Sequence, residues 1–114
     1  MITIYGIKNC DSVKKAIKFM KTNDLTYDFV DFRETPVCEE KVQAWLKKVE
    51  IKTLFNTRGT TYRTLKLKEL NLEDAEKASW LAKENMLIKR PIIEYDDKVI
   101  VAFDEVLYQE IFIK

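Results

Sequence analysis

Cys10 is the residue of this 114-residue chain whose type and position most clearly indicate chemistry. It follows the strand-like run Ile2–Tyr5 and precedes an amphipathic stretch that begins at about Asp11. A cysteine at such a strand-to-helix turn lies beside unpaired backbone N–H groups and the positive end of the helix dipole. Both favour the thiolate, which is the nucleophilic form of cysteine. The chain has no histidine, so backbone and cationic side chains would have to activate this thiol.

The alternative for Cys10 is a small buried core residue, because free cysteine is among the most buried residue types. Its flanking residues are polar and favour an accessible position: Lys8, Asn9, Asp11 and Ser12. The residue three positions after Cys10 is Val13, so the chain has no C-x-x-C pair. The pattern therefore predicts a reactive single thiol.

Two further features could serve a thiol site. Arg58 lies in the polar segment Asn56–Thr60, where a planar guanidinium could bind a carboxylate or another oxyanion. Arg90-Pro91 opens an apolar run, and cis peptide bonds, which could shape a binding site, are almost confined to the bond before a proline. The alternatives are an ordinary surface arginine and an ordinary trans proline at a strand start.

Cys38 is the second cysteine of the chain. It could resolve a mixed disulfide formed at Cys10. Nothing in the sequence brings the two thiols together, so an incidental cysteine is the favoured interpretation.

Composition excludes several kinds of site. Two cysteines without histidine cannot supply the usual four ligands of a structural zinc ion, so we expect no metal site. Two glycines exclude a glycine-rich nucleotide loop. A net charge of +1 gives no reason to expect nucleic acid or a membrane as a partner. Few cysteines, no signal peptide and no long apolar run lead us to expect a cytoplasmic protein.

The charges are unevenly distributed along the chain. Eight basic residues and one acidic residue lie within 41–68, whereas six acidic residues and one lysine lie within 94–110. Solvated helix faces explain most such runs, and the functional alternative is a patch that attracts an anionic ligand or partner.

The outer thirds of the chain have clear periodicity. Ile2–Tyr5 and Thr26–Phe32 are predicted strands joined by a helix over Asp11–Lys21, so they should be parallel. Pro91–Tyr95 and Val99–Phe103 read as a hairpin. Asp96-Asp97 is its turn, and a last helix starts at Asp104.

The middle third is predicted to be helical. One helix should start at Thr35-Pro36, because proline suits the first helical turn. A short helix is expected over Tyr62–Leu70. Asn71 should cap another helix that turns Ala75 inward. The order predicts a thioredoxin-like α/β fold with a mixed four-stranded sheet and a helical insertion at about 36–88, forming a single domain over 1–114.

Three blocks carry a resemblance to a known family. They span residues 5–16 (YGIKNCDSVKKA), 56–62 (NTRGTTY) and 89–92 (KRPI). In order and spacing they resemble the arsenate reductase (ArsC)/Spx family, most closely its YffB-like branch. The resemblance implies a glutaredoxin-like core and Cys10 as the reactive thiol. It implies that Arg58 and Arg90 flank this thiol and that Pro91 is the cis-proline.

Two departures from the family pattern narrow the function. Arsenate reductases of this family carry a third arginine after the last strands, and no arginine follows Pro91 here. Spx regulators, which bind RNA polymerase, commonly have C-x-x-C, which Val13 breaks. The resemblance thus implies a monothiol thiol-disulfide reductase of the YffB-like kind, with glutathione or a similar small thiol as co-substrate and no bound cofactor.

The expected site comprises Cys10 as the catalytic residue and four residues that bind the substrate or thiol: Asn9, Arg58, Arg90 and Pro91. The expected partners are the small thiol and an oxidised thiol substrate. An Spx-like regulator that uses the basic 41–68 segment to dock RNA polymerase is the alternative, and a true arsenate reductase ranks third.

Overall fold

The chain forms two compact units in the computed structural model, which describes residues 1–113. The sheet unit comprises Met1–Asp31 together with the chain from Arg90 onward. The helical unit comprises Phe32–Lys89. The expectation that both belong to a single domain stays a prediction.

The sheet unit contains a four-stranded mixed sheet. Its strands are β1 (Ile2–Gly6), β2 (Tyr27–Asp31), β3 (Ile92–Tyr95) and β4 (Lys98–Val101), in the order β2-β1-β3-β4. β1 pairs with β2 in parallel, and the other two pairs are antiparallel. This order, with the helical unit inserted between β2 and β3, confirms the predicted thioredoxin-like α/β fold.

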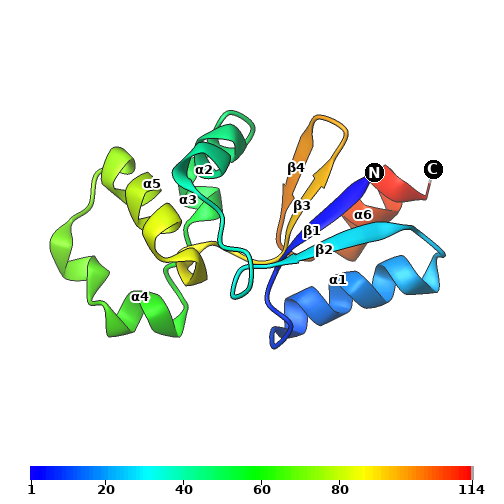
Figure 1. Cartoon of the computed structure of the whole chain (residues 1–114), viewed down its shortest axis with the longest axis horizontal. Coiled ribbons are helices and arrows are strands. Elements are labelled where there is room, and N and C mark those ends of the chain that lie inside the picture. The colour runs from blue at the N-terminus through cyan, green and yellow to red at the C-terminus, as the bar shows by residue number, and fades with distance from the viewer. Residues whose placement is uncertain (114) are drawn as a thin grey trace. The chain divides into compact units, whose positions relative to one another are not determined.

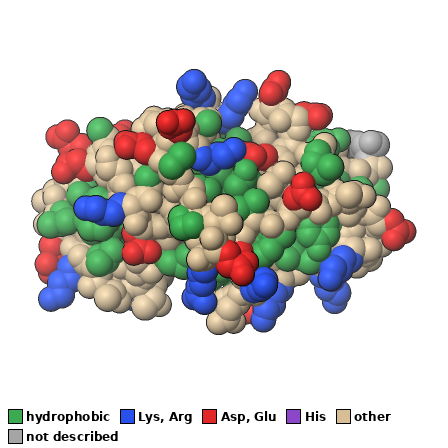
Figure 2. Space-filling view, in the orientation of Figure 1, with side chains coloured by type: hydrophobic (Ala, Val, Ile, Leu, Met, Phe, Trp, Pro, Cys, Tyr) green, Lys and Arg blue, Asp and Glu red, His purple; other side chains and the backbone are tan. Residues whose placement is uncertain are grey.

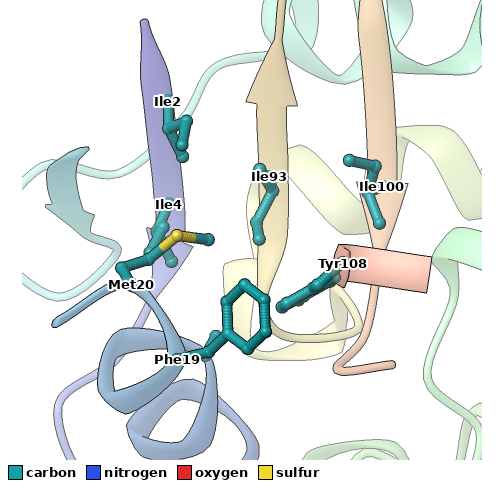
Figure 3. Packing of buried hydrophobic residues seen from close by; sticks show 8 residues of the cluster. Ile2, Ile4, Phe19, Met20, Ile93, Ile100 and Tyr108 are labelled. Atoms are coloured by element: carbon teal, nitrogen blue, oxygen red, sulfur yellow. The ribbon is translucent and has the colours of Figure 1, made fainter. Parts of the chain in front are cut away.

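Helices α1 (Asp11–Thr22) and α6 (Glu105–Phe112) complete the sheet unit. α1 forms because its apolar residues recur at helical spacing, and Ala16, Phe19 and Met20 are buried on one side of it. Figure 3 shows Phe19 and Met20 of α1 and Tyr108 of α6 turned toward isoleucines of the sheet. The phenyl ring of Phe19 meets that of Tyr108 edge to face, with ring centroids 5.5 Å apart. Both helices therefore pack on the same face of the sheet.

The ends of the hairpin are set by two residues in the left-handed backbone region. Asp96 has φ 52° in the turn between β3 and β4, at the predicted Asp96-Asp97 position. Ala102 has φ 71° and ends β4 earlier than the predicted boundary at Phe103. Asp104 then caps α6, because its Oδ1 accepts a hydrogen bond of 3.1 Å from the Leu107 N–H.

The helical unit is built from short helices around its own apolar core. Its elements are α2 (Glu39–Leu46), α3 (Ile51–Leu54), α4 (Thr60–Thr64), α5 (Asp74–Lys83) and the 3-10 helices η1 (Leu67–Leu70) and η2 (Asn85–Leu87). Figure 1 draws this unit from cyan through yellow, after β2 and before β3. Val42 and Trp45 of α2 and Leu81 of α5 are buried. No helix within residues 1–113 is both long and apolar enough to cross a membrane.

The predicted helix start at Thr35-Pro36 is wrong, because α2 begins only at Glu39. The cause lies 48 residues further along the chain. The buried Asn85 side chain accepts a hydrogen bond of 2.9 Å from the Val37 N–H and donates one of 3.3 Å to the Val37 carbonyl. The second bond uses the Val37 carbonyl, which a helix starting at Pro36 would need as an acceptor for an N–H group four residues further on.

Three predictions around η1 also fail. The helix expected over Tyr62–Leu70 is divided into α4 and η1, because Lys66 has φ 53°. Asn71 does not cap α5: it has φ 49° at the end of η1, and Glu73 is the N-cap. Ala75 is exposed rather than turned inward.

Candidate functional site

Cys10 is the N-cap residue of α1 and has extended backbone angles, φ −142° and ψ 123°. Its carbonyl accepts the first helical hydrogen bond, 2.9 Å from the Lys14 N–H. The thiol is not in a disulfide, and the residue is half-buried. Asn9 beside it is exposed. The structure thus puts a partly accessible thiol where the backbone N–H groups of the first helical turn lack intrahelical partners.

Close packing of β1 against α1 fixes this strand-to-helix turn. A Cβ atom on Gly6 would lie 2.6 Å from Cγ2 of Val13, and Val13 is fully buried. Any larger residue at position 6 would force the first turn of α1 away from the strand end. The residue three positions after Cys10 is therefore part of the core contact that positions Cys10.

The Arg90-Pro91 peptide bond is cis, as the family resemblance implied. Pro91 is buried, whereas Arg90 is half-buried with its Nε atom inside the protein. The Pro91 carbonyl accepts a hydrogen bond of 2.8 Å from the Ala102 N–H. The Ala102 carbonyl in turn accepts one of 2.8 Å from the Tyr108 hydroxyl. Helix α6 is therefore hydrogen-bonded to the residue that follows β4, and this residue is hydrogen-bonded to the Pro91 backbone.

Tyr108 is kept neutral in this arrangement. Burial of the side chain raises the pKa of Tyr108 far above its ordinary value, and the carboxylate of Asp104 raises it further. A neutral hydroxyl is needed to donate to the Ala102 carbonyl, so the environment preserves the donor at any pH near neutrality.

The register of the sheet brings most of the predicted site residues to the same end of the strands. Tyr5 is paired with Ile92, so the end of β1 lies beside the start of β3. Cys10 and Asn9 follow the end of β1, and Arg90 and Pro91 precede β3. These four predicted residues therefore share one end of the sheet unit.

Asp31 belongs to the same end of the sheet and was not predicted. It is the register partner of Gly6 at the end of β2 and is only 9% exposed. A carboxylate is rarely buried without partners. The sequence signal that could have found it is an aspartate that directly follows the apolar pair Phe29-Val30 at the end of a predicted strand.

Arg58 belongs to the helical unit, in the exposed loop before α4. Its backbone N–H donates a hydrogen bond of 3.1 Å to Oδ1 of Asn56. A Cβ atom on Gly59 would lie 2.8 Å from Nδ2 of Asn56, so glycine at this position makes room for that amide. The loop is anchored next to its start, where the Asn56 N–H donates to the Leu87 carbonyl at 2.8 Å. The guanidinium therefore projects from a compact, anchored loop.

Cys38 is also a helix N-cap, which the sequence reasoning missed because it placed the helix start earlier. It is the exposed N-cap residue of α2 in the helical unit, and it is not in a disulfide. Two glutamates, Glu39 and Glu40, follow it in the first turn. The two cysteines therefore differ in local charge and exposure rather than in position relative to a helix.

The basic 41–68 segment lies wholly within the helical unit. Lys52 forms an exposed ion pair with Glu50, with Nζ and Oε2 3.6 Å apart. Figure 2 shows basic side chains in small groups among acidic and apolar ones on the face that it displays. This mixture is typical of solvated surface and gives the patch interpretation no support on that face.

Comparisons with known proteins agree with one another. The model of the ArsC family matches residues 5–111. An uncharacterized protein of Haemophilus influenzae is 39% identical over 113 residues, covering 98% of this chain and 99% of its own. The Spx global transcriptional regulator of Listeria innocua is 24% identical over 107 residues, covering 92% of this chain and 82% of its own.

Solved structures give the same picture. The structure of a YffB protein has a TM-score of 0.90 and 29% identity, covering 96% of this chain and 97% of that one. An arsenate reductase (ArsC) related protein from Brucella melitensis has a TM-score of 0.77 and 34% identity, covering 97% of this chain and 93% of that one. The likeness to both extends along almost the whole chain.

Proposed function

Because this chain belongs to the ArsC family, we propose that it is a thiol-disulfide reductase with Cys10 as the nucleophile and glutathione as its small-thiol co-substrate. The observation that carries the proposal is the place of Cys10. It is half-buried at the N-terminus of α1, at the same end of the sheet unit as the cis Arg90-Pro91 bond. Membership of this family, together with an accessible thiol at a helix N-terminus, supports a reaction in which Cys10 attacks a sulfur atom.

The proposed reaction reduces a mixed disulfide between glutathione and a substrate thiol. The Cys10 thiolate attacks the glutathione sulfur, a new disulfide forms between them, and the substrate sulfur leaves and takes up a proton. A second glutathione thiolate then attacks the glutathione sulfur of that disulfide. Oxidised glutathione and the Cys10 thiolate are released. The sum consumes one reduced glutathione per substrate thiol freed and needs no second protein thiol, in keeping with Val13 three residues after Cys10.

The remaining predicted residues have binding roles in this proposal. Arg58 and Arg90 would hold the carboxylates of the thiol peptide, because a guanidinium forms paired hydrogen bonds with a carboxylate. Asn9 would contact the same peptide beside the thiol. The backbone at Arg90-Pro91 would align it as an added strand.

Turnover tests the proposal with a matched pair of cysteine variants. The wild-type protein and Cys38→Ser should both reduce the mixed disulfide of glutathione and cysteine when reduced glutathione is present, and Cys10→Ser should not. Consumption of reduced glutathione, coupled to release of free cysteine, is the measurement. Equal activity of Cys10→Ser and the wild-type protein would reject Cys10 as the nucleophile.

The second candidate function is an Spx-like regulator that docks RNA polymerase through the basic 41–68 segment. The specific support is the match to Spx regulators. Co-purification of RNA polymerase with the protein, lost when Lys47 and Lys48 are replaced by glutamine, would favour this function. A true arsenate reductase ranks third, because no arginine follows Pro91 in the sequence.

A further inference from the structure

A pocket of about 290 Å³ in the helical unit is lined by residues of that unit alone. None of the residues assigned to thiol chemistry lines it, although its lining residue Thr57 directly precedes Arg58 in the chain. Its shape depends on η1. Lys66 and Asn71, at the two ends of this short helix, both have left-handed backbone angles. The two reversals direct Leu67 inward, where it is 1% exposed, and leave Lys68 exposed at the pocket wall.

The floor of the pocket is apolar and partly aromatic. Phe55 and Leu67 line it and are almost fully buried, and the half-buried Leu72 adds to it. Tyr62, another lining residue, meets Phe55 edge to face with ring centroids 5.8 Å apart. This contact fixes both rings, so the floor is a preformed surface for a flat apolar group.

The polar lining is cationic. Lys68 and Lys77 both line the pocket, and no carboxylate does. Neither lysine forms an ion pair within the part of the chain that the structure describes. The neighbouring Glu73 and Glu76 are used in the capping box of α5, where each side chain accepts a hydrogen bond from the other's backbone N–H. Two ammonium groups that form no ion pair within the described residues therefore lie beside an apolar floor.

We propose that this pocket binds a small aromatic phosphate monoester. A phosphate monoester carries up to two negative charges near neutral pH, matching the two lysines, and lysine binds phosphate as a point charge. Thr57 and Asn71 also line the pocket and carry groups that can donate hydrogen bonds to further phosphate oxygens. The aromatic part would lie on the floor formed by Phe55, Leu67 and Leu72.

The size of the pocket limits the ligand. Sites for drug-sized molecules occupy about 300–1,000 Å³, and this pocket is at the lower end of that range. It suits one ring with one phosphate group. Because Cys10 takes no part, binding should be the same in Cys10→Ser, so this proposal can fail or succeed independently of the proposed reductase function.

Titration with phenyl phosphate, followed by amide NMR shifts of the whole chain, tests the proposal. We expect saturable shifts at Phe55–Thr57, at Leu67–Leu72 and at Lys77. Inorganic phosphate, which lacks the ring, and benzyl alcohol, which lacks the charge, should each bind at least several-fold more weakly. Shifts that do not saturate, that map elsewhere, or that are the same for inorganic phosphate would overturn the proposal.

Charge-matched variants complete the test. Replacing both Lys68 and Lys77 with glutamine should weaken phenyl phosphate binding at least tenfold. The same change at the exposed Lys47 and Lys48, which do not line the pocket, should leave it unchanged. Should the first variant lose its folded NMR spectrum, Lys68→Glu alters one exposed side chain and should also weaken binding at least tenfold. Equal weakening by both lysine pairs would show only a general charge effect and would overturn the assigned site.

Discussion

At the scale of single residues, the two cysteines provide an internal comparison. Both are N-caps, of α1 and of α2. Cys38 is the more exposed, so access alone would make it react faster. Local charge acts in the opposite direction. Two glutamates, Glu39 and Glu40, follow Cys38, whereas a single aspartate follows Cys10 in the first turn of α1, before Lys14 and Lys15. We expect charge to outweigh access.

The corresponding prediction concerns alkylation. Cys10 should react with iodoacetamide at pH 7 roughly tenfold faster than Cys38, because cationic neighbours stabilise the attacking thiolate and carboxylates destabilise it. Peptide mapping after timed labelling of the wild-type protein measures both rates in one sample. If Cys38 reacts at the same rate or faster, exposure controls reactivity and Cys10 has no special activation.

Arginine variants test the assigned binding roles. Arg58→Lys and Arg90→Lys keep the charge but lose the planar fork. Each should slow glutathione addition to Cys10 by roughly tenfold, because a charge-assisted hydrogen bond contributes about 1.5–3 kcal/mol and much of it would be lost. Arg63→Lys in α4 is a matched control, since Arg63 is exposed and has no role in the proposed thiol site.

The melting temperature distinguishes binding from structure in these variants. Arg58 is exposed, so its replacement should leave thermal unfolding unchanged. A variant that melts at a lower temperature but adds glutathione at the wild-type rate would show that the altered arginine is structural. Its assignment to ligand binding would then be wrong.

At the scale of elements, Tyr108 links α6 to the end of β4. Its hydroxyl donates to the Ala102 carbonyl, and Ala102 donates to Pro91. Tyr108→Phe should lower the free energy of unfolding at pH 7 by about 1–3 kcal/mol, because the partly buried Ala102 carbonyl loses its partner. Urea unfolding of the variant and the wild-type protein measures this difference.

The same variant should have a different pH dependence. The pKa of Tyr108 is raised by burial, so above about pH 10 the unfolded chain loses this proton before the folded protein does. The Tyr108 contribution to stability is therefore complete below about pH 10 and falls as the pH rises further. The stability difference between wild type and Tyr108→Phe should narrow at alkaline pH. A difference that stays constant to about pH 11 would contradict this account of Tyr108.

At the scale of the whole molecule, local pattern predicted the sheet unit better than the helical unit. The strands and α1 follow from short-range periodicity, and the start of α6 follows from Asp104 as a cap. The site residues of the sheet unit were predictable for the same reason, since Cys10 and Pro91 adjoin elements with clear boundaries.

Errors in the helical unit have long-range causes. The start of α2 depends on hydrogen bonds between Asn85 and Val37, which no local pattern encodes. The break at Lys66 uses a left-handed conformation that is uncommon for lysine, so nothing at that position predicts it. The buried Asp31 and the N-cap position of Cys38 were missed because both depend on where neighbouring elements end.

The central claim is that Cys10 alone forms a mixed disulfide with glutathione. Intact-mass analysis after treatment with oxidised glutathione, followed by peptide mapping, tests it most directly. We predict the addition of one glutathione to the wild-type protein and to Cys38→Ser, located on Cys10, and none to Cys10→Ser. Loss of two protons through a Cys10–Cys38 disulfide, or addition to Cys38 alone, would contradict the account.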